Sequence, residues 1–104
     1  KCMDRERDVE RYLVGRVERL GGMCMKFVSP GNDGVPDRIV ILPGGVIVFV
    51  ELKARHGRLN SIQKWQQGCL KRRDVDVRTV WSREQVDEML KEVCRCSLDH
   101  TAIR

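Results

Sequence analysis

The most restrictive feature of this sequence is a pair of apolar segments joined by three turn-forming residues. The tripeptide Pro43-Gly44-Gly45 separates Asp37–Leu42 from Val46–Lys53, a pattern typical of a β-hairpin. The second segment is apolar at five consecutive positions, Val46–Val50, which predicts a central strand buried on both faces. With 104 residues, the chain has room for one compact domain around this hairpin.

Helical and extended patterns alternate along the rest of the chain. The predicted elements are a helix from the N-cap Asp4 to Gly21-Gly22, strands at Met23–Val28, Asp37–Leu42, Val46–Lys53 and Val75–Trp81, a helix capped by Asn60 or Ser61, and a helix that begins at the capping box Ser82-Arg83-Glu84-Gln85. This order, α-β-β-β-α-β-α, predicts an α/β fold, a single small domain with a mixed central sheet flanked by helices. We expect the domain to span residues 1–94 and residues 95–104 to form a loose C-terminal tail.

Aromatic residues on the apolar helical stripes are predicted to lie in the core. Tyr12 follows the stripe of the first helix, and Trp65 shares the stripe of the second helix with Ile62 and Leu70. Trp81, at the end of the last predicted strand, is assigned either to the core or to an interface.

Cysteine usage and hydropathy restrict the cellular setting. The five cysteines are an odd number with no secretory signal ahead of them, so we expect reduced thiols in an intracellular protein, in the cytoplasm of a bacterium or a phage-infected host. A zinc site at Cys94, Cys96 and His100 is the less favoured alternative, because the cysteines are too closely spaced for the usual pair and no second pair follows. The longest apolar run is far shorter than the ~20 residues of a membrane span, so no membrane contact is expected.

The positive charge of the chain is concentrated in one segment. The net charge is +5, and the segment Lys53–Arg73 contains seven basic residues and no acidic one, so the remainder is slightly acidic. A focused basic surface binds polyanions, and the competing interpretation is a solvated basic face. The seven residues are Lys53, Arg55, Arg58, Lys64, Lys71, Arg72 and Arg73.

Three charged residues stand at the ends of the hairpin strands, where charge is unfavourable. Glu51 and Lys53 are two residues apart, so their side chains project from one face of the strand. A three-residue loop pairs Leu42 with Val46 and places Asp37 directly opposite Glu51, whereas a two-residue loop would shift this register. Two opposed carboxylates repel, and a Mg²⁺ ion beside a lysine relieves that repulsion. The alternative is a strand-end ion pair, with Asp37 capping a turn.

These residues carry a resemblance to a known family. Gly34-Val35-Pro36-Asp37, thirteen intervening residues and then Glu51-Leu52-Lys53 resemble the PD-(D/E)xK nuclease signature. With a helix glutamate, a Ser-Pro-Gly loop, a Gly-Gly hairpin and a glutamine on the second helix, the pattern is similar to the VRR-NUC branch, the virus-type replication-repair nucleases, in its small stand-alone phage-type form. The resemblance spans residues 6–93 and implies a restriction-endonuclease-like core. One departure is Asp74, where the family usually has glycine.

The resemblance implies a role for each residue of the signature. Asp37 and Glu51 would bind Mg²⁺, or Mn²⁺ in its place, together with the main-chain carbonyl of Leu52. Lys53 would orient or deprotonate the attacking water and neutralise charge on the phosphate. No organic cofactor is implied.

Four further positions match the family less strictly. Glu6 matches the helix glutamate better than Glu10 does and would lie near the metal. Gln63 would support Lys53 or contact the phosphate, and Ser29 would contact DNA or the active site. The residues expected to hold the DNA backbone are Arg55, Arg58, Lys64, Lys71, Arg72 and Arg73.

The function expected on these grounds is that of a metal-dependent, structure-selective DNA endonuclease. We expect cleavage of branched DNA, the four-way Holliday junction above all, by a homodimer, because two symmetric cuts need two active sites. The alternatives are a flap nuclease or nickase on the same fold, and a DNA-binding subunit of a repair or replication complex without catalysis of its own.

Overall fold

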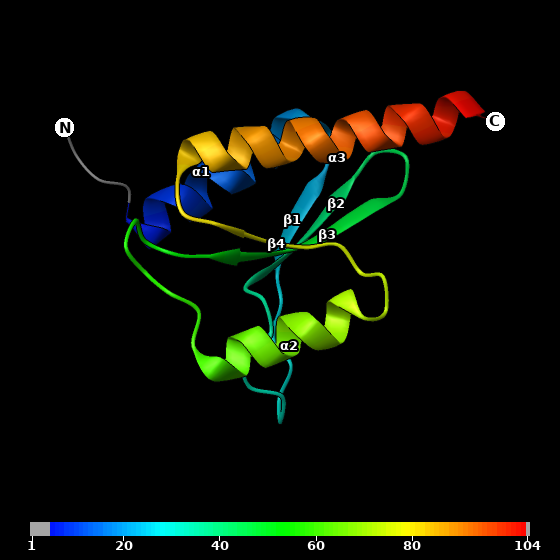
Figure 1. The fold of residues 1–104 in the computed structure, drawn as a ribbon. Helices are drawn as coiled ribbons and strands as arrows, with labels where there is room; N and C mark the ends of the chain where they lie inside the picture. Colours follow the sequence, from blue (N-terminus) through cyan, green and yellow to red (C-terminus); the bar gives the residue numbers. More distant parts are fainter. Residues whose placement is uncertain (1–4, 104) are drawn as a thin grey trace.

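A computed structural model of the chain has three helices and four strands within residues 5–103, the part of the backbone that it describes (Figure 1). Side chains are described as far as residue 94. The elements are α1 (Glu6–Arg19), β1 (Met23–Lys26), β2 (Arg38–Leu42), β3 (Val46–Leu52), α2 (Ser61–Lys71), β4 (Val77–Val80) and α3 (Arg83–Ile103). The predicted α/β class and the order of the elements are confirmed.

The four strands form one mixed sheet in the order β1-β2-β3-β4. The first three strands are antiparallel neighbours, and β4 joins β3 in parallel after the α2 crossover. Leu42 pairs with Val46, so the register predicted from a three-residue hairpin loop is confirmed. β3 is central, as predicted, but its outer face is not fully buried, because the Ile47 side chain is exposed.

The helices cover the two faces of the sheet unequally. α1 and α3 pack together on one face, and α2 lies on the other, where it contacts β4 (Figure 1). Tyr12 packs against the core between the sheet and the α1–α3 layer, as predicted, and its hydroxyl donates to Asp87 over 2.9 Å. The buried members of this core are Val9, Leu13, Val17, Val40, Leu42, Val48, Val50, Leu52, Val80, Val86, Met89, Leu90 and Val93.

The second helix presents two amide side chains to the sheet. Gln67 is buried, and its Nε2 donates to Thr79 Oγ1 on β4 over 2.8 Å. Gln63, one turn earlier, reaches Glu51 at the end of β3. Because the polar side of α2 faces the sheet, the opposite side is left in solvent, and the prediction that Trp65 lies in the core is wrong: its side chain is 63% exposed.

The structure corrects one predicted helix start and decides between two candidate N-caps for another. The N-cap of α1 is Arg5 and not Asp4, which lies outside the described residues. Asn60, and not Ser61, caps α2, because its Oδ1 accepts a hydrogen bond of 2.8 Å from the Gln63 N–H. This cap leaves the Gln63 side chain at the first turn of the helix, directly beside β3.

The last helix begins as predicted and extends further. The Ser82 hydroxyl accepts a hydrogen bond of 3.1 Å from the Gln85 N–H. The helix continues to Ile103, through the segment expected to be a loose tail. Side chains beyond residue 94 are not described, so the division of the chain at that residue stays a prediction, and Cys96 and His100 of the zinc alternative lie outside the described side chains.

The turn between α2 and β4 contains the residue that departs from the family pattern. Asp74 has a φ of 62°, in the left-handed region that glycine adopts freely and that aspartate tolerates. Its N–H donates to the Lys71 carbonyl over 3.0 Å. Aspartate therefore makes the turn that the family usually builds with glycine.

The lengths of the helices and the state of the cysteines bear on the expected setting of the chain. Within the described backbone, no helix combines the length and the apolar character needed to cross a membrane. The cysteines whose side chains are described, Cys24, Cys69 and Cys94, are free thiols.

The unequal covering of the sheet makes a prediction for stability. Leu13→Ala removes a fully buried side chain between α1 and the sheet, and we expect it to lower the free energy of unfolding by about 2–5 kcal/mol. Trp65→Ala removes an exposed side chain, and we expect a change within about 0.5 kcal/mol for the isolated protomer. Urea unfolding followed by circular dichroism measures both. A comparable loss in Trp65→Ala would show that the indole is buried after all.

Candidate active site

Two carboxylates meet at one end of the central hairpin. Asp37 directly precedes β2, and Glu51 is the penultimate residue of β3. The register pairs Arg38 with Val50, so one residue further along it brings Asp37 opposite Glu51. Asp37 Oδ2 accepts a hydrogen bond of 2.9 Å from the Leu52 N–H, which holds this carboxylate against the backbone of β3.

The Glu51 carboxylate is buried among polar partners. Its residue is only 2% exposed, and Glu51 Oε2 lies 3.6 Å from Lys53 Nζ. Burial, followed by repulsion from Asp37, raises the pKa of Glu51 to about 7, and the nearby Lys53 ammonium opposes that rise. A protonation change near neutral pH at a buried carboxylate is typical of functional sites.

The cap of α2 orients the amide that contacts this carboxylate. Gln63 Oε1 accepts a hydrogen bond of 3.0 Å from the Asn60 N–H. With the amide oxygen occupied, the Nε2 atom of Gln63 is directed at Glu51 Oε2, to which it donates over 3.0 Å. The same residues thus begin the helix and position a donor on the Glu51 carboxylate.

The first helix contributes one of its two glutamates to this end of the sheet. Burial, then repulsion from Asp37, raises the pKa of Glu6, and attraction to Lys53 opposes the rise, so Glu6 lies within electrostatic reach of the site. Glu10 instead binds Arg38 Nε at 2.8 Å. Of the two glutamates, the structure therefore brings Glu6 and not Glu10 to the carboxylate pair.

The donors at this site suit a hard divalent cation. Among the described side chains, no group of three or more His, Cys, Asp and Glu residues gathers as a metal cluster. The site offers the carboxylates of Asp37 and Glu51 and a main-chain carbonyl at Leu52, which are oxygen donors of the kind that Mg²⁺ prefers. Burial, and then repulsion from Asp37, leave the ionised Glu51 poorly stabilised, as its raised pKa shows, so the residues present fit a bound divalent cation.

The remaining predicted residues lie further from the carboxylates. The Ser29 hydroxyl accepts a hydrogen bond of 2.9 Å from Asn32 within its own loop, and no described interaction links it to the carboxylates. The six cations predicted to hold DNA, Arg55, Arg58, Lys64, Lys71, Arg72 and Arg73, are exposed in the loop before α2, along that helix and just after it.

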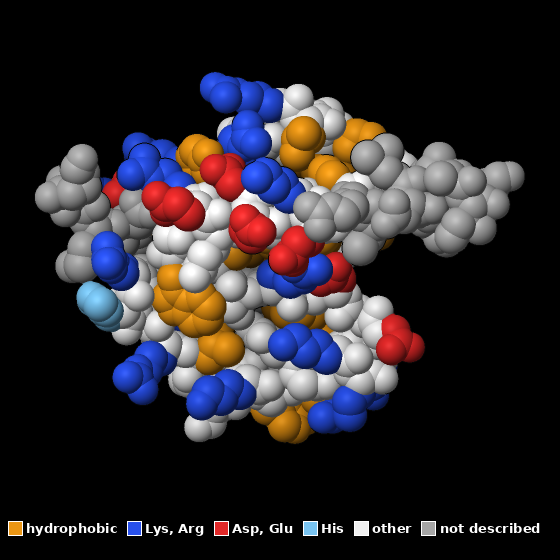
Figure 2. All heavy atoms as spheres, turned by 45° about the horizontal axis from the view of Figure 1, so that its top comes forward, with side chains coloured by type: hydrophobic (Ala, Val, Ile, Leu, Met, Phe, Trp, Pro, Cys, Tyr) orange, Lys and Arg blue, Asp and Glu red, His pale blue; other side chains and the backbone are white. Residues whose placement is uncertain are grey.

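The length of α2 separates these cations from one another. The helix has 11 residues and is therefore about 16 Å long, so its C-terminal cations are roughly that far from the end that carries Gln63. Arg73 is tied to that C-terminal end, because its Nη1 donates to the Cys69 carbonyl over 2.9 Å. Figure 2 shows lysines and arginines prevailing in its lower part and charges of both signs mixed above. Four of the basic residues therefore follow the helix or its C-terminal end, whereas Arg55 and Arg58 lie in the loop that leads from β3 to it.

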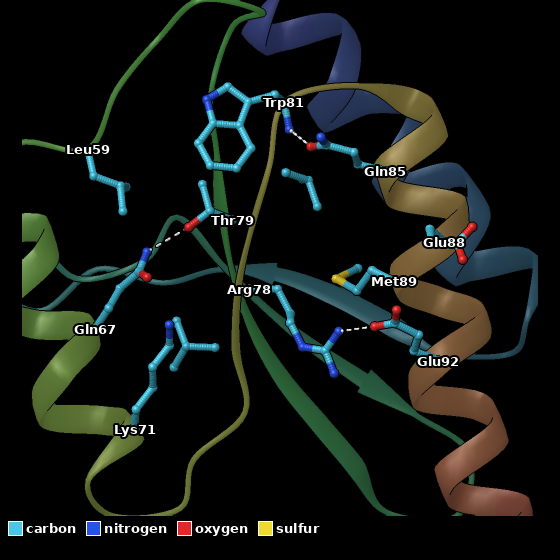
Figure 3. A pocket seen from close by; sticks show the side chains of 12 residues that line it. Leu59, Gln67, Lys71, Arg78, Thr79, Trp81, Gln85, Glu88, Met89 and Glu92 are labelled. Carbon is cyan, nitrogen blue, oxygen red and sulfur yellow. Dashed lines mark hydrogen bonds and ion pairs between the residues drawn. The ribbon is translucent and has the colours of Figure 1, made fainter.

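Sequence reasoning missed a groove on the outer side of β4 (Figure 3). It has a volume of about 500 Å³ between α2, β4 and α3. Gln67 and Thr79 meet on one side of it, and Arg78 joins Glu92 of α3 over 2.6 Å on the other (Figure 3). Gln63 and Gln67 are four residues apart, which places both amides on one face of α2. This spacing is the signal in the sequence that could have predicted a polar face there.

Comparison with known proteins identifies similar chains by sequence and by structure. No protein-family model matches the chain. A stretch of 50 residues is 58% identical to "Putative nuclease p44" of Acyrthosiphon pisum secondary endosymbiont phage 1. That match covers 48% of this chain and 54% of the relative, so the chain spans about half the length of the curated protein it matches.

A solved structure resembles nearly the whole fold. It is described as "VRR_NUC domain", and its sequence is 37% identical to this chain. The superposition has a TM-score of 0.78 and covers 83% of this chain and 94% of the other. Sequence identity and shared fold thus extend over most of both chains.

The raised pKa of Glu51 makes a prediction for the metal-free protein. Its folded-state pKa, about 7, lies above the unfolded value, so its contribution to stability is lost as the pH rises from about 4.5 to 7. Glu51→Gln in EDTA should therefore raise the free energy of unfolding by about 1–3 kcal/mol at about pH 8 and change it little at about pH 4.5. Urea titrations at both pH values measure this. An equal effect at the two pH values would contradict the assignment.

Proposed function

The chain belongs to the VRR-NUC family, and on that premise we propose that it is a metal-dependent, structure-selective DNA endonuclease. The observation that supports this most directly is the buried Glu51 carboxylate between Asp37 and Lys53. Two acids and a lysine that converge at one end of a sheet serve phosphodiester hydrolysis, because the reaction needs an activated water and a neutralised phosphate.

Asp37 and Glu51 would hold Mg²⁺, or Mn²⁺ in its place, with the carbonyl of Leu52. When bound, the ion polarises the scissile phosphate and lowers the pKa of a coordinated water. The hydrogen bond between Asp37 Oδ2 and the Leu52 N–H supports this assignment, since it keeps one carboxylate oxygen occupied and the other available. Lys53 orients the attacking water and neutralises charge that develops on the phosphate, and in-line attack leaves 5′-phosphate and 3′-hydroxyl ends.

Glu6 and Gln63 are positioning residues in this proposal. Gln63 holds the Glu51 carboxylate in place through a 3.0 Å hydrogen bond that the α2 cap orients. Glu6 adds negative charge beside Asp37 and orders water near the ion. Both act through the carboxylate pair and not on the substrate itself.

The proposed substrate is branched DNA, above all the four-way junction, cleaved by a homodimer in a phage or prophage setting. The exposed cations along α2 support contact with the phosphate backbone, which reads charge and shape and carries no sequence information. The printed name of the phage relative supports the nuclease class, and the choice of a junction rests on the need for two symmetric cuts.

Removing one carboxylate charge tests the catalytic assignment. We expect Asp37→Asn to lower the cleavage rate by about 100-fold or more while DNA affinity is kept, because the amide oxygen still accepts the Leu52 N–H but binds Mg²⁺ poorly. The matched control is Glu10→Gln, a glutamate of α1 that is paired with Arg38. The measurement is cleavage of labelled four-way junction, flap and linear duplex DNA with Mg²⁺, Mn²⁺ or EDTA.

Each outcome of that experiment identifies a function. Paired symmetric cuts in the junction, lost with EDTA and in Asp37→Asn, would establish the proposed resolvase. Preference for the flap, or single nicks, would support the nuclease activity and contradict the four-way junction as the preferred substrate. Tight DNA binding without metal-dependent cleavage of any substrate would indicate a binding subunit and overturn the proposal.

Salt dependence tests the proposed DNA surface. We expect Arg58→Gln to reduce the slope of log affinity against log salt by about 0.9, because one phosphate contact is lost. Arg11→Gln, which changes an exposed arginine of α1 outside the basic segment, should leave the slope unchanged. Fluorescence anisotropy of labelled junction DNA in EDTA measures both slopes. Equal slopes for the two variants would show that Arg58 does not contact the DNA.

A further inference from the structure

The loop between β3 and α2 begins with a hydrogen-bonded turn. The Gly57 N–H donates to the Ala54 carbonyl over 2.8 Å, so Arg55 occupies one of the two central positions of a β-turn. Its side chain is exposed, as is that of Arg58 directly after the turn, whereas Gly57 is partly buried. The loop therefore turns its arginines outward and its glycine toward the protein. We call residues 54–58 the basic turn.

A tryptophan at the end of β4 holds the basic turn. Trp81 Nε1 donates to the Gly57 carbonyl over 2.6 Å, although the two residues are 24 positions apart in the sequence. The indole N–H is a donor only, and it finds an acceptor when the ring is removed from solvent. Trp81, which was predicted to lie in the core or at an interface, is partly buried and lines the groove beside β4 together with Leu59 (Figure 3).

The start of α3 fixes the backbone that carries this indole. The Trp81 N–H donates to Gln85 Oε1 over 2.7 Å, and the Gln85 N–H donates to the Ser82 hydroxyl over 3.1 Å. On the other side, the carbonyl of Val80 accepts the Lys53 N–H over 3.0 Å, which ties the end of β4 to β3. The backbone around Trp81 is therefore held from both directions. An indole on a fixed backbone is a pre-organised donor, because it has only two side-chain torsions.

The basic turn is compact, so a contact at its glycine holds all of it. A Cβ atom at Gly57 would lie 3.3 Å from the carbonyl oxygen of Ala54 and 3.4 Å from its nitrogen, which shows how closely the turn folds back on itself. The turn is attached at Gly57 by the indole and at Lys53, just before it, by the main chain of Val80. Two adjacent residues at the end of β4 therefore hold both ends of the basic turn.

We propose that Trp81 is a positioning residue for DNA binding: its indole holds the basic turn so that Arg55 and Arg58 are directed outward before DNA binds. This role rests on the proposed function, because it concerns the surface that contacts the substrate. Holding the turn lowers the conformational entropy that its arginines lose when they bind phosphate. The indole acts through the turn and not on the DNA, since its N–H is already donated to Gly57, and Glu88 in the same groove would repel a phosphate.

The arrangement of the loop separates DNA binding from chemistry. Lys53 is held through its own N–H by the Val80 carbonyl, and its Nζ lies 3.6 Å from Glu51 Oε2. Neither contact involves the indole. Loss of the hydrogen bond between Trp81 and Gly57 should therefore loosen the arginines and leave the lysine in place, so that KM for DNA changes more than kcat.

A matched pair of tryptophan substitutions tests whether the indole holds the turn. Trp81→Phe removes the N–H donor and keeps an aromatic ring, and the control Trp65→Phe changes the exposed tryptophan of α2. Without DNA, trypsin should cleave after Arg55 and Arg58 about 5-fold faster in Trp81→Phe than in the wild type or the control, because one hydrogen bond no longer opposes local opening. Cleavage after Lys71, outside the turn, should be unchanged. Mass spectrometry identifies the sites, and circular dichroism checks the fold.

A double-mutant cycle tests whether Trp81 acts through the arginines. Fluorescence anisotropy of labelled junction DNA in EDTA should give a dissociation constant about 5-fold higher for Trp81→Phe than for the wild type. When Arg55→Gln and Arg58→Gln are both present, Trp81→Phe should change the constant by less than about 2-fold, because the turn then has no arginine to position. A residue that only stabilises the fold, or that contacts DNA directly, would weaken binding by the same factor in both backgrounds.

Equal factors in the two backgrounds, or unchanged trypsin cleavage of the basic turn, would overturn the inference. If Trp81→Phe loses its fold, NMR of the wild type replaces it: the indole N–H of Trp81 should exchange with solvent about tenfold more slowly than that of the exposed Trp65, and equal rates would contradict the hydrogen bond.

Cleavage assays separate this inference from the proposed function. A chain that shows the coupling in DNA binding and never cleaves DNA would support the role of Trp81 and contradict the nuclease. Cleavage by Trp81→Phe with an unchanged KM for DNA would support the nuclease and contradict the role of Trp81.

Discussion

The register of the central hairpin is the constraint on which the rest of this structure depends. It places the Asp37 and Glu51 carboxylates opposite each other at the end of a strand that is otherwise apolar. Burial and the repulsion from Asp37 raise the pKa of Glu51 to about 7, and the nearby Lys53 ammonium offsets only part of that rise. Proteins retain such unfavourable charge arrangements mainly at functional sites, where a ligand stabilises them.

The second helix connects the active site to β4. Its Asn60 cap orients Gln63 toward Glu51, and its buried Gln67 fixes it against β4. With amides facing the sheet, the opposite side of the helix, which includes Lys64 and Trp65, is left in solvent. A helix docked by its apolar stripe would bury Trp65, so the polar docking is what leaves this side chain in solvent.

Much of the fold and the signature residues could be predicted, because they depend on neighbours in sequence. A three-residue loop determines the pairing of Leu42 with Val46, and alternation along the strand then determines which residue faces Asp37. The position of Trp65 could not be predicted in the same way. Helical periodicity identifies an apolar side, but burial depends on whether another element covers it, and in this chain none of the described elements does. The conformation of Asp74 also depends on its surroundings, because the turn between α2 and β4 imposes its left-handed backbone.

The sequence by itself determined the order of the elements, the hairpin register and the convergence of Asp37, Glu51 and Lys53, because turns, caps and strand alternation act over a few residues. Tertiary structure decided that Glu6, which the family resemblance favours, approaches the carboxylates while Glu10 pairs with Arg38, that Gln63 holds one carboxylate, and that α2 leaves part of one face of the sheet uncovered. Each of these depends on the angle and distance at which elements far apart in the chain pack together. Local sequence patterns identify the faces that are able to pack, and only the folded chain determines which of these faces contact each other.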